Sequence, residues 1–141
     1  MNKKKTLSNE EINVNYSKEG KDTRKQTGML GEDAACRFLL DSNYVIIERN
    51  WRCRSGEIDI IAEHDNRIVF LEVRTRKNGG RFGTAAESVD RRKQLQVRET
   101  ALVYMRSIGR TETAIRFDVI ALTMSRQGDE IIECKHYEGA F

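Results

Sequence analysis

Two acidic residues occupy positions where their side chains could act together. Asp59 lies in 57–63 and Glu72 lies in 68–76, and both segments alternate apolar and polar residues as the strands of a β-hairpin do. If Asp65-Asn66 is a two-residue turn, residues paired across the hairpin have numbers that add up to 131, which sets Asp59 opposite Glu72. Both carboxylates are then expected on one face of the hairpin, and the other face is expected to carry Ile58, Ile60, Leu71 and Val73.

The paired carboxylates predict a cation between them. Opposed side chains in a hairpin have Cβ atoms about 5 Å apart, so two negative charges there destabilise the sheet. Arg74 or Arg52 could neutralise them in an ordinary salt bridge, and a divalent metal ion could do so as well. Because the surroundings offer carboxylate oxygens without Cys or His, a metal here is expected to be Mg²⁺ or Mn²⁺ rather than Zn²⁺.

Hydrophobic periodicity predicts the helices that must accompany this hairpin. From Thr27 to about Asp41, a period of about 100° per residue turns Glu32 toward the buried stripe and Asp33 toward water. A second helix is predicted from an N-cap at Ser88 to about Ile108, and Gly109 ends it. Its inward stripe is expected to contain Val89, Lys93, Val97, Ala101, Tyr104 and Ile108.

Further strands are predicted at 44–47, 115–123 and 130–137. The resulting order, α-β-β-β-α-β-β, predicts a single α/β domain over 27–141, with a mixed central sheet flanked by helices. Residues 1–26 are polar and show no sustained period, so they are predicted to form a flexible tail.

Charge and composition narrow the functional classes. The tail accounts for the whole net charge of +3, whereas residues 48–110 carry fourteen Lys and Arg against nine Asp and Glu. This local excess is typical of a surface that faces a polyanion, although a solvated mixed-charge surface explains it equally well. The chain shows no apolar run long enough for a membrane span, no secretory signal, and only three scattered cysteines. We therefore expect a cytoplasmic protein without disulfides or membrane contacts.

Several spaced motifs run through these segments. Gly-Glu-Ile-Asp-Ile-Ile-Ala at 56–62 and Val-Phe-Leu-Glu-Val-Arg-Thr-Arg at 69–76 follow Gly28-x-x-Gly31-Glu32-x-x-Ala35, and the series continues with Phe82-Gly83, Lys93 and Arg-Phe-Asp-Val at 116–119. Over roughly 27–141 this pattern closely resembles the YraN family of small bacterial proteins. That family is similar to the PD-(D/E)xK nucleases, especially the archaeal-type Holliday junction resolvases, which implies a restriction-endonuclease-like core of order α-β-β-β-α-β.

The resemblance implies a role for each candidate residue. The superfamily's aspartate falls on Asp59, the glutamate of its E-x-K element on Glu72 and its helix-borne glutamate on Glu32, which together imply a Mg²⁺ or Mn²⁺ site. Arg74 occupies the lysine position, and a guanidinium can hold a phosphate but cannot act as a base. Lys93 could compensate by reaching the site with its amine, or it could simply extend past the edge of the core.

The implied activity is metal-dependent hydrolysis of phosphodiesters in branched or structured DNA, with Asp59, Glu72, Arg74 and Lys93 as the catalytic residues. The residues expected to follow the nucleic-acid backbone are Arg52, Arg54, Arg76, Lys77 and Arg81. Two alternatives remain open: a nucleic-acid-binding module of the same fold with little or no catalysis, and a protein–protein adaptor with salt-bridged acids. Junction resolvases act as dimers, so a homodimer is a further expectation, although the sequence identifies no interface.

Overall fold

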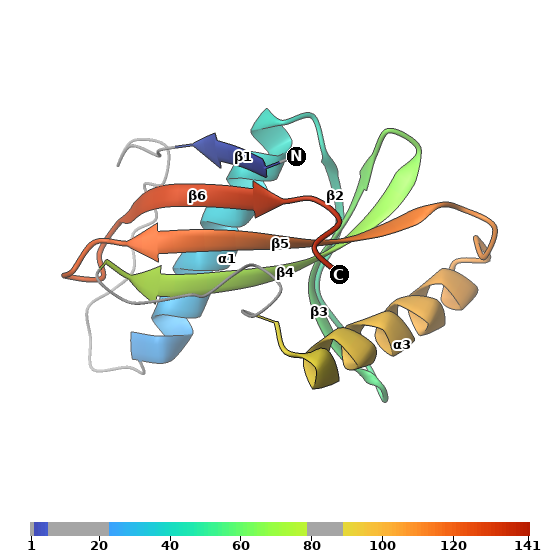
Figure 1. Ribbon diagram of the computed structural model, residues 1–141. Helices are drawn as coiled ribbons and strands as arrows, with labels where there is room; N and C mark the ends of the chain where they lie inside the picture. Colours follow the sequence, from blue (N-terminus) through green and yellow to red (C-terminus); the bar gives the residue numbers. More distant parts are fainter. Residues whose placement is uncertain (1, 6–22, 79–88) are drawn as a thin grey trace.

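The computed structural model describes residues 2–5, 23–78 and 89–141 (Figure 1). The described helices are α1 (Thr23–Asp41) and α3 (Arg91–Ser107), and the strands are β1 (Asn2–Lys5), β2 (Val45–Cys53), β3 (Gly56–His64), β4 (Arg67–Lys77), β5 (Ile115–Met124) and β6 (Ile131–Tyr137). The strands form one mixed sheet in the order β1-β6-β5-β4-β3-β2, in which β4 and β5 run parallel and the other described neighbours run antiparallel. This is the predicted α/β fold with a restriction-endonuclease-like core.

The hairpin of β3 and β4 forms as predicted. Asp65 and Asn66 have φ values of 50° and 62°, the left-handed conformation that both central residues of a type I′ turn require. From this turn to the pair of Ile60 with Leu71, the strands keep the predicted register. The local turn chemistry and the alternating pattern were therefore sufficient to determine the pairing.

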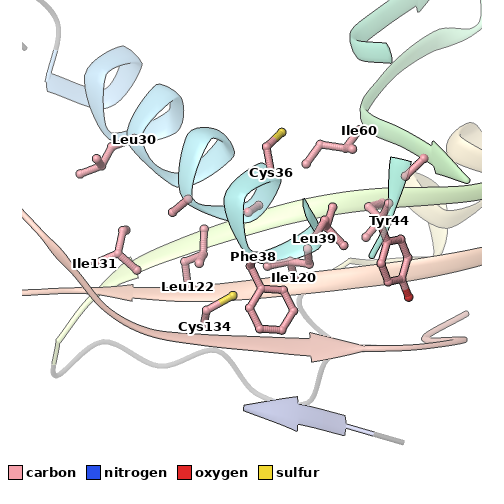
Figure 2. Close-up of a cluster of buried hydrophobic side chains, with 14 of the residues drawn as sticks. Leu30, Cys36, Phe38, Leu39, Tyr44, Ile60, Ile120, Leu122, Ile131 and Cys134 are labelled. Atoms are coloured by element: carbon pink, nitrogen blue, oxygen red, sulfur yellow. The ribbon is translucent and has the colours of Figure 1, made fainter. Parts of the chain in front are cut away.

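The two helices cover opposite faces of the sheet (Figure 1). On the α1 side, Leu39 packs in a buried cluster with Leu71 and other apolar side chains of the sheet (Figure 2). On the α3 side, Val97 packs in a second buried cluster with Phe70. Since Phe70 and Leu71 are consecutive residues of β4, this strand buries side chains on both faces, as a central strand of an α/β sheet does.

One predicted face of the hairpin is wrong. Ile58 packs in the cluster beneath α3, whereas Ile60 packs in the cluster beneath α1, although strict alternation predicts one face for both. The change of face falls at Asp59, opposite Asn50 of β2, which has a φ of 51°, and directly beyond the last regular β3–β4 pair, Ile60 with Leu71. Side chains alternate strictly only along a regular strand pairing, and this pairing is irregular here.

The boundaries of α3 also differ from the prediction. Asp90 caps the helix, because its Oδ1 accepts a hydrogen bond of 2.8 Å from the backbone amide of Lys93, and the predicted cap at Ser88 lies outside the described residues. Gly109, with a φ of 68°, follows the end of the helix as predicted. Ile108 is 38% exposed, so it does not belong to the inward stripe.

The N-terminal region has more structure than its composition suggested. Asn2–Lys5 pairs with β6 as an antiparallel strand, and α1 begins at Thr23 rather than at Thr27. Strand pairing uses backbone groups that every residue carries, so a polar segment can supply it without an apolar pattern. Residues 6–22 of the predicted tail lie outside the described part of the chain. Neither described helix is long and apolar enough to cross a lipid bilayer.

Candidate functional site

A cavity of about 350 Å³ opens where α1 and α3 meet the strands β3 and β4. Its walls are formed by Thr27, Gly28, Glu32, Asp59, Glu72, Val73, Arg74, Thr75 and Lys93. This set contains every residue for which a metal-binding or catalytic role was predicted. Two helices and two strands therefore contribute residues to one cavity. Its carboxylates could bind a metal ion, and its basic side chains could bind a phosphate group.

Gly31 lets α1 approach the sheet closely enough to form this cavity. A Cβ atom at Gly31 would collide with the side-chain oxygen of Thr75 in β4. Only glycine leaves room for this contact, so α1 packs directly on the strand that carries Glu72. The next residue of the helix, Glu32, consequently lies on the cavity wall.

The centre of the site is the carboxyl pair of Asp59 and Glu72. Asp59 Oδ2 accepts a hydrogen bond of 2.8 Å from the backbone amide of Val73, just beyond the last regular pair of the hairpin. Glu72 is 1% exposed, and its Oε1 has no hydrogen-bond partner in the described part of the chain. The backbone of β4 therefore holds Asp59, and the carboxyl groups of Asp59 and Glu72 are close enough to shift each other's pKa values.

Burial and mutual repulsion raise the pKa values of both acids. Burial, together with the neighbouring charge of Asp59, raises the pKa of Glu72 to about 8. Burial also raises the pKa of Asp59, while the amide of Val73 opposes the shift. Near neutral pH the pair therefore retains a proton, as expected of two carboxylates that share a site without a sufficient counter-charge.

Two basic side chains stand beside this pair without neutralising it. Lys93 Nζ lies 3.9 Å from Glu72 Oε2, and its side chain is 31% exposed. Arg74 Nε is buried and has no acceptor among the described residues. Both cations favour the charged form of Glu72, but burial outweighs them and its pKa remains high. An ordinary closed salt bridge, one of the alternatives, is therefore a poor description of this site.

Glu32 faces the pair from another wall of the cavity. Its Oε2 accepts a hydrogen bond of 2.9 Å from Asn50 Nδ2 and lies 3.8 Å from the guanidinium of Arg49. Burial raises the pKa of Glu32, Asn50 lowers it, and Asp59 raises it. Within the described segments, no three Asp, Glu, His or Cys side chains are close enough to hold a metal ion by themselves. The three acids predicted to bind one metal ion are thus a carboxyl pair, Asp59 and Glu72, and a third acid, Glu32, that lies on another wall of the cavity.

Two residues of β2, Arg49 and Asn50, bind the carboxylate of Glu32. Sequence reasoning did not predict either of them. Arg49 also forms an ion pair of 2.8 Å with Asp33, so Asp33 does not simply face water as predicted. Asn50 was a detectable signal, because Asn tolerates the left-handed backbone conformation better than most residues.

Four of the five residues predicted to contact a nucleic-acid backbone are described by the structure, and none of these four lines the cavity. Arg81 is not among the described residues. Arg52 pairs with an acid of β3 at 3.2 Å, and Arg76 donates to a threonine of β5 at 3.5 Å. The other two, Arg54 and Lys77, are exposed. Their proposed contact with nucleic acid stays a prediction.

A second polar cluster, around Asp118, is closed. Arg116 donates two hydrogen bonds of 2.9 Å to Asp118, and His136 and the amide of Gly139 also hydrogen-bond to this acid. Burial alone would raise the pKa of Asp118, but the hydrogen bonds from His136, Arg116 and Gly139 lower it below its usual value. This acid is satisfied in the way that Glu72 is not.

Comparison with known proteins identifies the family. The model of the Uncharacterised protein family UPF0102 matches residues 31–122. A UPF0102 protein of Moorella thermoacetica is 47% identical over 119 residues, which cover 84% of this chain and 98% of the relative. Relatives from Geotalea daltonii and Pelotomaculum thermopropionicum are 42% and 40% identical over 124 and 120 residues, covering 87% and 85% of this chain and 94% and 98% of their own. The chain therefore belongs to the UPF0102 family, which is the YraN family that its motifs resemble.

Proposed function

We propose that this protein is a Mg²⁺- or Mn²⁺-dependent endonuclease that hydrolyses phosphodiester bonds in branched or otherwise structured DNA. The observation that carries the proposal is the buried pair of Asp59 and Glu72 in a cavity that Arg74 and Lys93 also line. Carboxylate oxygens suit a hard divalent cation, and nearby cationic side chains suit the phosphate that such an ion binds.

The residues present fit such an ion. Glu72 Oε1 is buried without a partner in the described part of the chain, and a ligand position there would satisfy it. Asp59 is already oriented by the amide of Val73. Mg²⁺ usually keeps several waters and uses only one or two protein carboxylates together with phosphate oxygens. Two adjacent acids are therefore sufficient, and Glu32 would contact the ion's water rather than the ion.

The side chains around the pair have distinct roles in this mechanism. A divalent ion bound to Asp59 and Glu72 would polarise the scissile phosphate and lower the pKa of a water. Lys93 and Arg74 would stabilise the negative charge that builds up on the phosphate. Because Arg74 cannot accept a proton, Glu32 Oε1 is the group that would orient the attacking water and take its proton.

One observation favours a second candidate, a nucleic-acid-binding module without catalysis. Arg74 stands where the resembling nucleases carry a lysine, and it lines the cavity without an acceptor for its buried Nε among the described residues. An arginine there would still bind phosphate strongly. In that case the same site would recognise nucleic acid without cleaving it.

A cleavage assay separates the candidates. Labelled four-way junctions, flaps and plain duplexes would be incubated with Mg²⁺ or Mn²⁺ and with a chelator, using the wild type and Glu72→Gln. The matched control is Glu63→Gln, since Glu63 also lies on the hairpin but forms only a half-exposed pair with Arg110. We expect metal-dependent cleavage by the wild type and the control, and a loss of about a hundredfold or more in Glu72→Gln.

Three results would contradict the nuclease. Equal cleavage by the wild type and Glu72→Gln would indicate a contaminating enzyme. Binding without cleavage of any substrate would support the second candidate. Absence of both binding and metal-induced thermal stabilisation would leave the adaptor alternative, because only a metal site gains stability from the ion by mass action.

A further inference from the structure

The outer face of α3 carries a strong excess of positive charge. The helix contains five basic residues and one acidic residue, Glu99. Lys93 belongs to the cavity, whereas Arg91, Arg92 and Arg106 are exposed and form no ion pair within the described part of the chain. An exposed helix is usually stabilised by opposite charges three or four residues apart, and these arginines have no such neighbour within α3. The charge pattern of α3 therefore does not serve the helix itself.

The start of α3 makes the same point independently. Its first turn begins with Arg91, Arg92 and Lys93 and contains no acid. The N-terminus of a helix carries a partial positive charge, so cations there are unfavourable, and the N-cap acid Asp90 is one carboxylate beside three cations. An anionic ligand at this end would offset the remaining positive charge.

We infer that this face of α3, from Arg91 to Arg106, receives the phosphate backbone of duplex nucleic acid and leads it into the cavity. The inference rests on the proposed function and extends it with a docking surface that lies outside the predicted basic residues. Lys93 lies on the inward side of α3, about 100° around the helix from Arg92, and its Nζ is 3.9 Å from Glu72 Oε2. The start of α3 therefore lies next to the carboxyl pair, and a backbone that follows the arginines to this end would come close to it.

The length of α3 sets the footprint. From Lys93 to Arg106 the helix axis rises about 20 Å at about 1.5 Å per residue. Successive base pairs of a duplex are about 3.4 Å apart, so this distance corresponds to about six base pairs. Arg106 is therefore expected to contact the duplex about six base pairs from the reacting phosphate.

A second copy of the chain is a less suitable occupant. Leu95 and Leu102 are 54% and 50% exposed on the same face, so an apolar contact is available. If two copies of α3 packed antiparallel around these leucines, Arg91 of each copy would face Arg106 of the other. In a parallel arrangement each arginine would face its own counterpart. Both arrangements bring like charges together, whereas a polyanion neutralises them.

The test compares the double variant Arg91→Gln/Arg106→Gln with Arg37→Gln. Arg37 is also an exposed helical arginine, but it lies on α1, which covers the opposite face of the sheet. Binding of a fluorescent duplex would be measured by anisotropy at several salt concentrations, with Ca²⁺ present. We expect the double variant to raise Kd about tenfold or more and to lower the slope of log K against log salt by about two. Arg37→Gln should change neither value.

The outcomes separate this inference from the proposed function. If the wild type binds and cleaves while the double variant matches it, the docking surface is refuted and the nuclease stands. If the wild type neither binds nor cleaves any substrate, both proposals fail. If the duplex arm of the substrate is shortened to about four base pairs, it no longer reaches Arg106, so Arg106→Gln should no longer weaken binding. Light scattering would detect a dimer. If Leu95→Ser/Leu102→Ser dissociated that dimer and the arginine variants bound nucleic acid as the wild type does, the face would belong to an interface with a second copy of the chain.

Discussion

Raising the pH should destabilise the metal-free protein, because the buried Glu72 is more stable in its protonated form than as a charged carboxylate. In the folded chain its pKa is about 8, against 4.5 for an ordinary glutamate. Between these values the folded state holds a proton that the unfolded state has released, so the free energy of unfolding falls as the pH rises. The stabilisation is complete below pH 4.5 and is lost once the pH has passed about 8.

The size of the effect follows from the two pKa values. At about 1.4 kcal/mol per pH unit, the difference corresponds to about 5 kcal/mol at most. A domain of this size has a total stability of about 5–15 kcal/mol, so the loss is a large fraction of it. Each kcal/mol lowers Tm by roughly 3 °C in a chain of this length. A decrease in Tm of several degrees between pH 6 and pH 9 is therefore expected.

Glu72→Gln isolates this contribution, since the amide keeps the shape of the protonated carboxyl group at every pH. Above pH 8, without divalent ions, we expect this variant to be more stable than the wild type by several degrees in Tm. Mg²⁺ should stabilise the wild type by about 2.7 kcal/mol at a hundred times its Kd, and should leave the variant unchanged. Thermal unfolding followed by circular dichroism from pH 6 to pH 9 measures both effects.

The reasoning fails if wild type and Glu72→Gln lose stability in parallel as the pH rises, or if Mg²⁺ stabilises both equally. Glu63→Gln is the control, because it removes an acid of the same hairpin from a partly exposed position, and it should follow the wild type. Calorimetric titration gives an independent check: metal binding should release about one proton near pH 7 and almost none at pH 9.

Four other substitutions, at Gly31, Gly28, Arg74 and Asp118, test the fold and the site. Gly31→Ala should cost about 1–3 kcal/mol in urea unfolding because of the collision with Thr75, and Thr75→Ala should restore most of it. Gly28→Ala, where an added Cβ meets nothing within 4 Å, should instead stabilise the helix by about 0.5–1 kcal/mol. Arg74→Lys should retain metal-dependent cleavage within about tenfold, whereas cleavage by this variant alone would mark the wild type as a binding module. Asp118→Ala should cost about 3–5 kcal/mol in urea unfolding, because Arg116 and the buried His136 would both lose the acid that they share, and a neutral result would show that the cluster is solvated.

Much of the fold was decided by short-range information. The alternation in β3 and β4 and the tolerance of Asp65-Asn66 for left-handed φ values were enough to predict the register. Helical periodicity placed Glu32 on the side of α1 that reaches the cavity. The same motifs that predicted these elements also predicted the family, and this was confirmed. All of these properties depend on residues that are neighbours along the chain.

The tertiary structure alone decided how the acids behave. The change of face between Ile58 and Ile60 lies opposite Asn50, where β3 pairs with β2 and its regular pairing with β4 has ended. Glu72 has a raised pKa because it is buried beside Asp59 and the helix that carries Lys93 supplies too little charge to offset this. Desolvation and Coulomb energy depend on distances in space between residues that are remote in sequence, and no local pattern contains those distances.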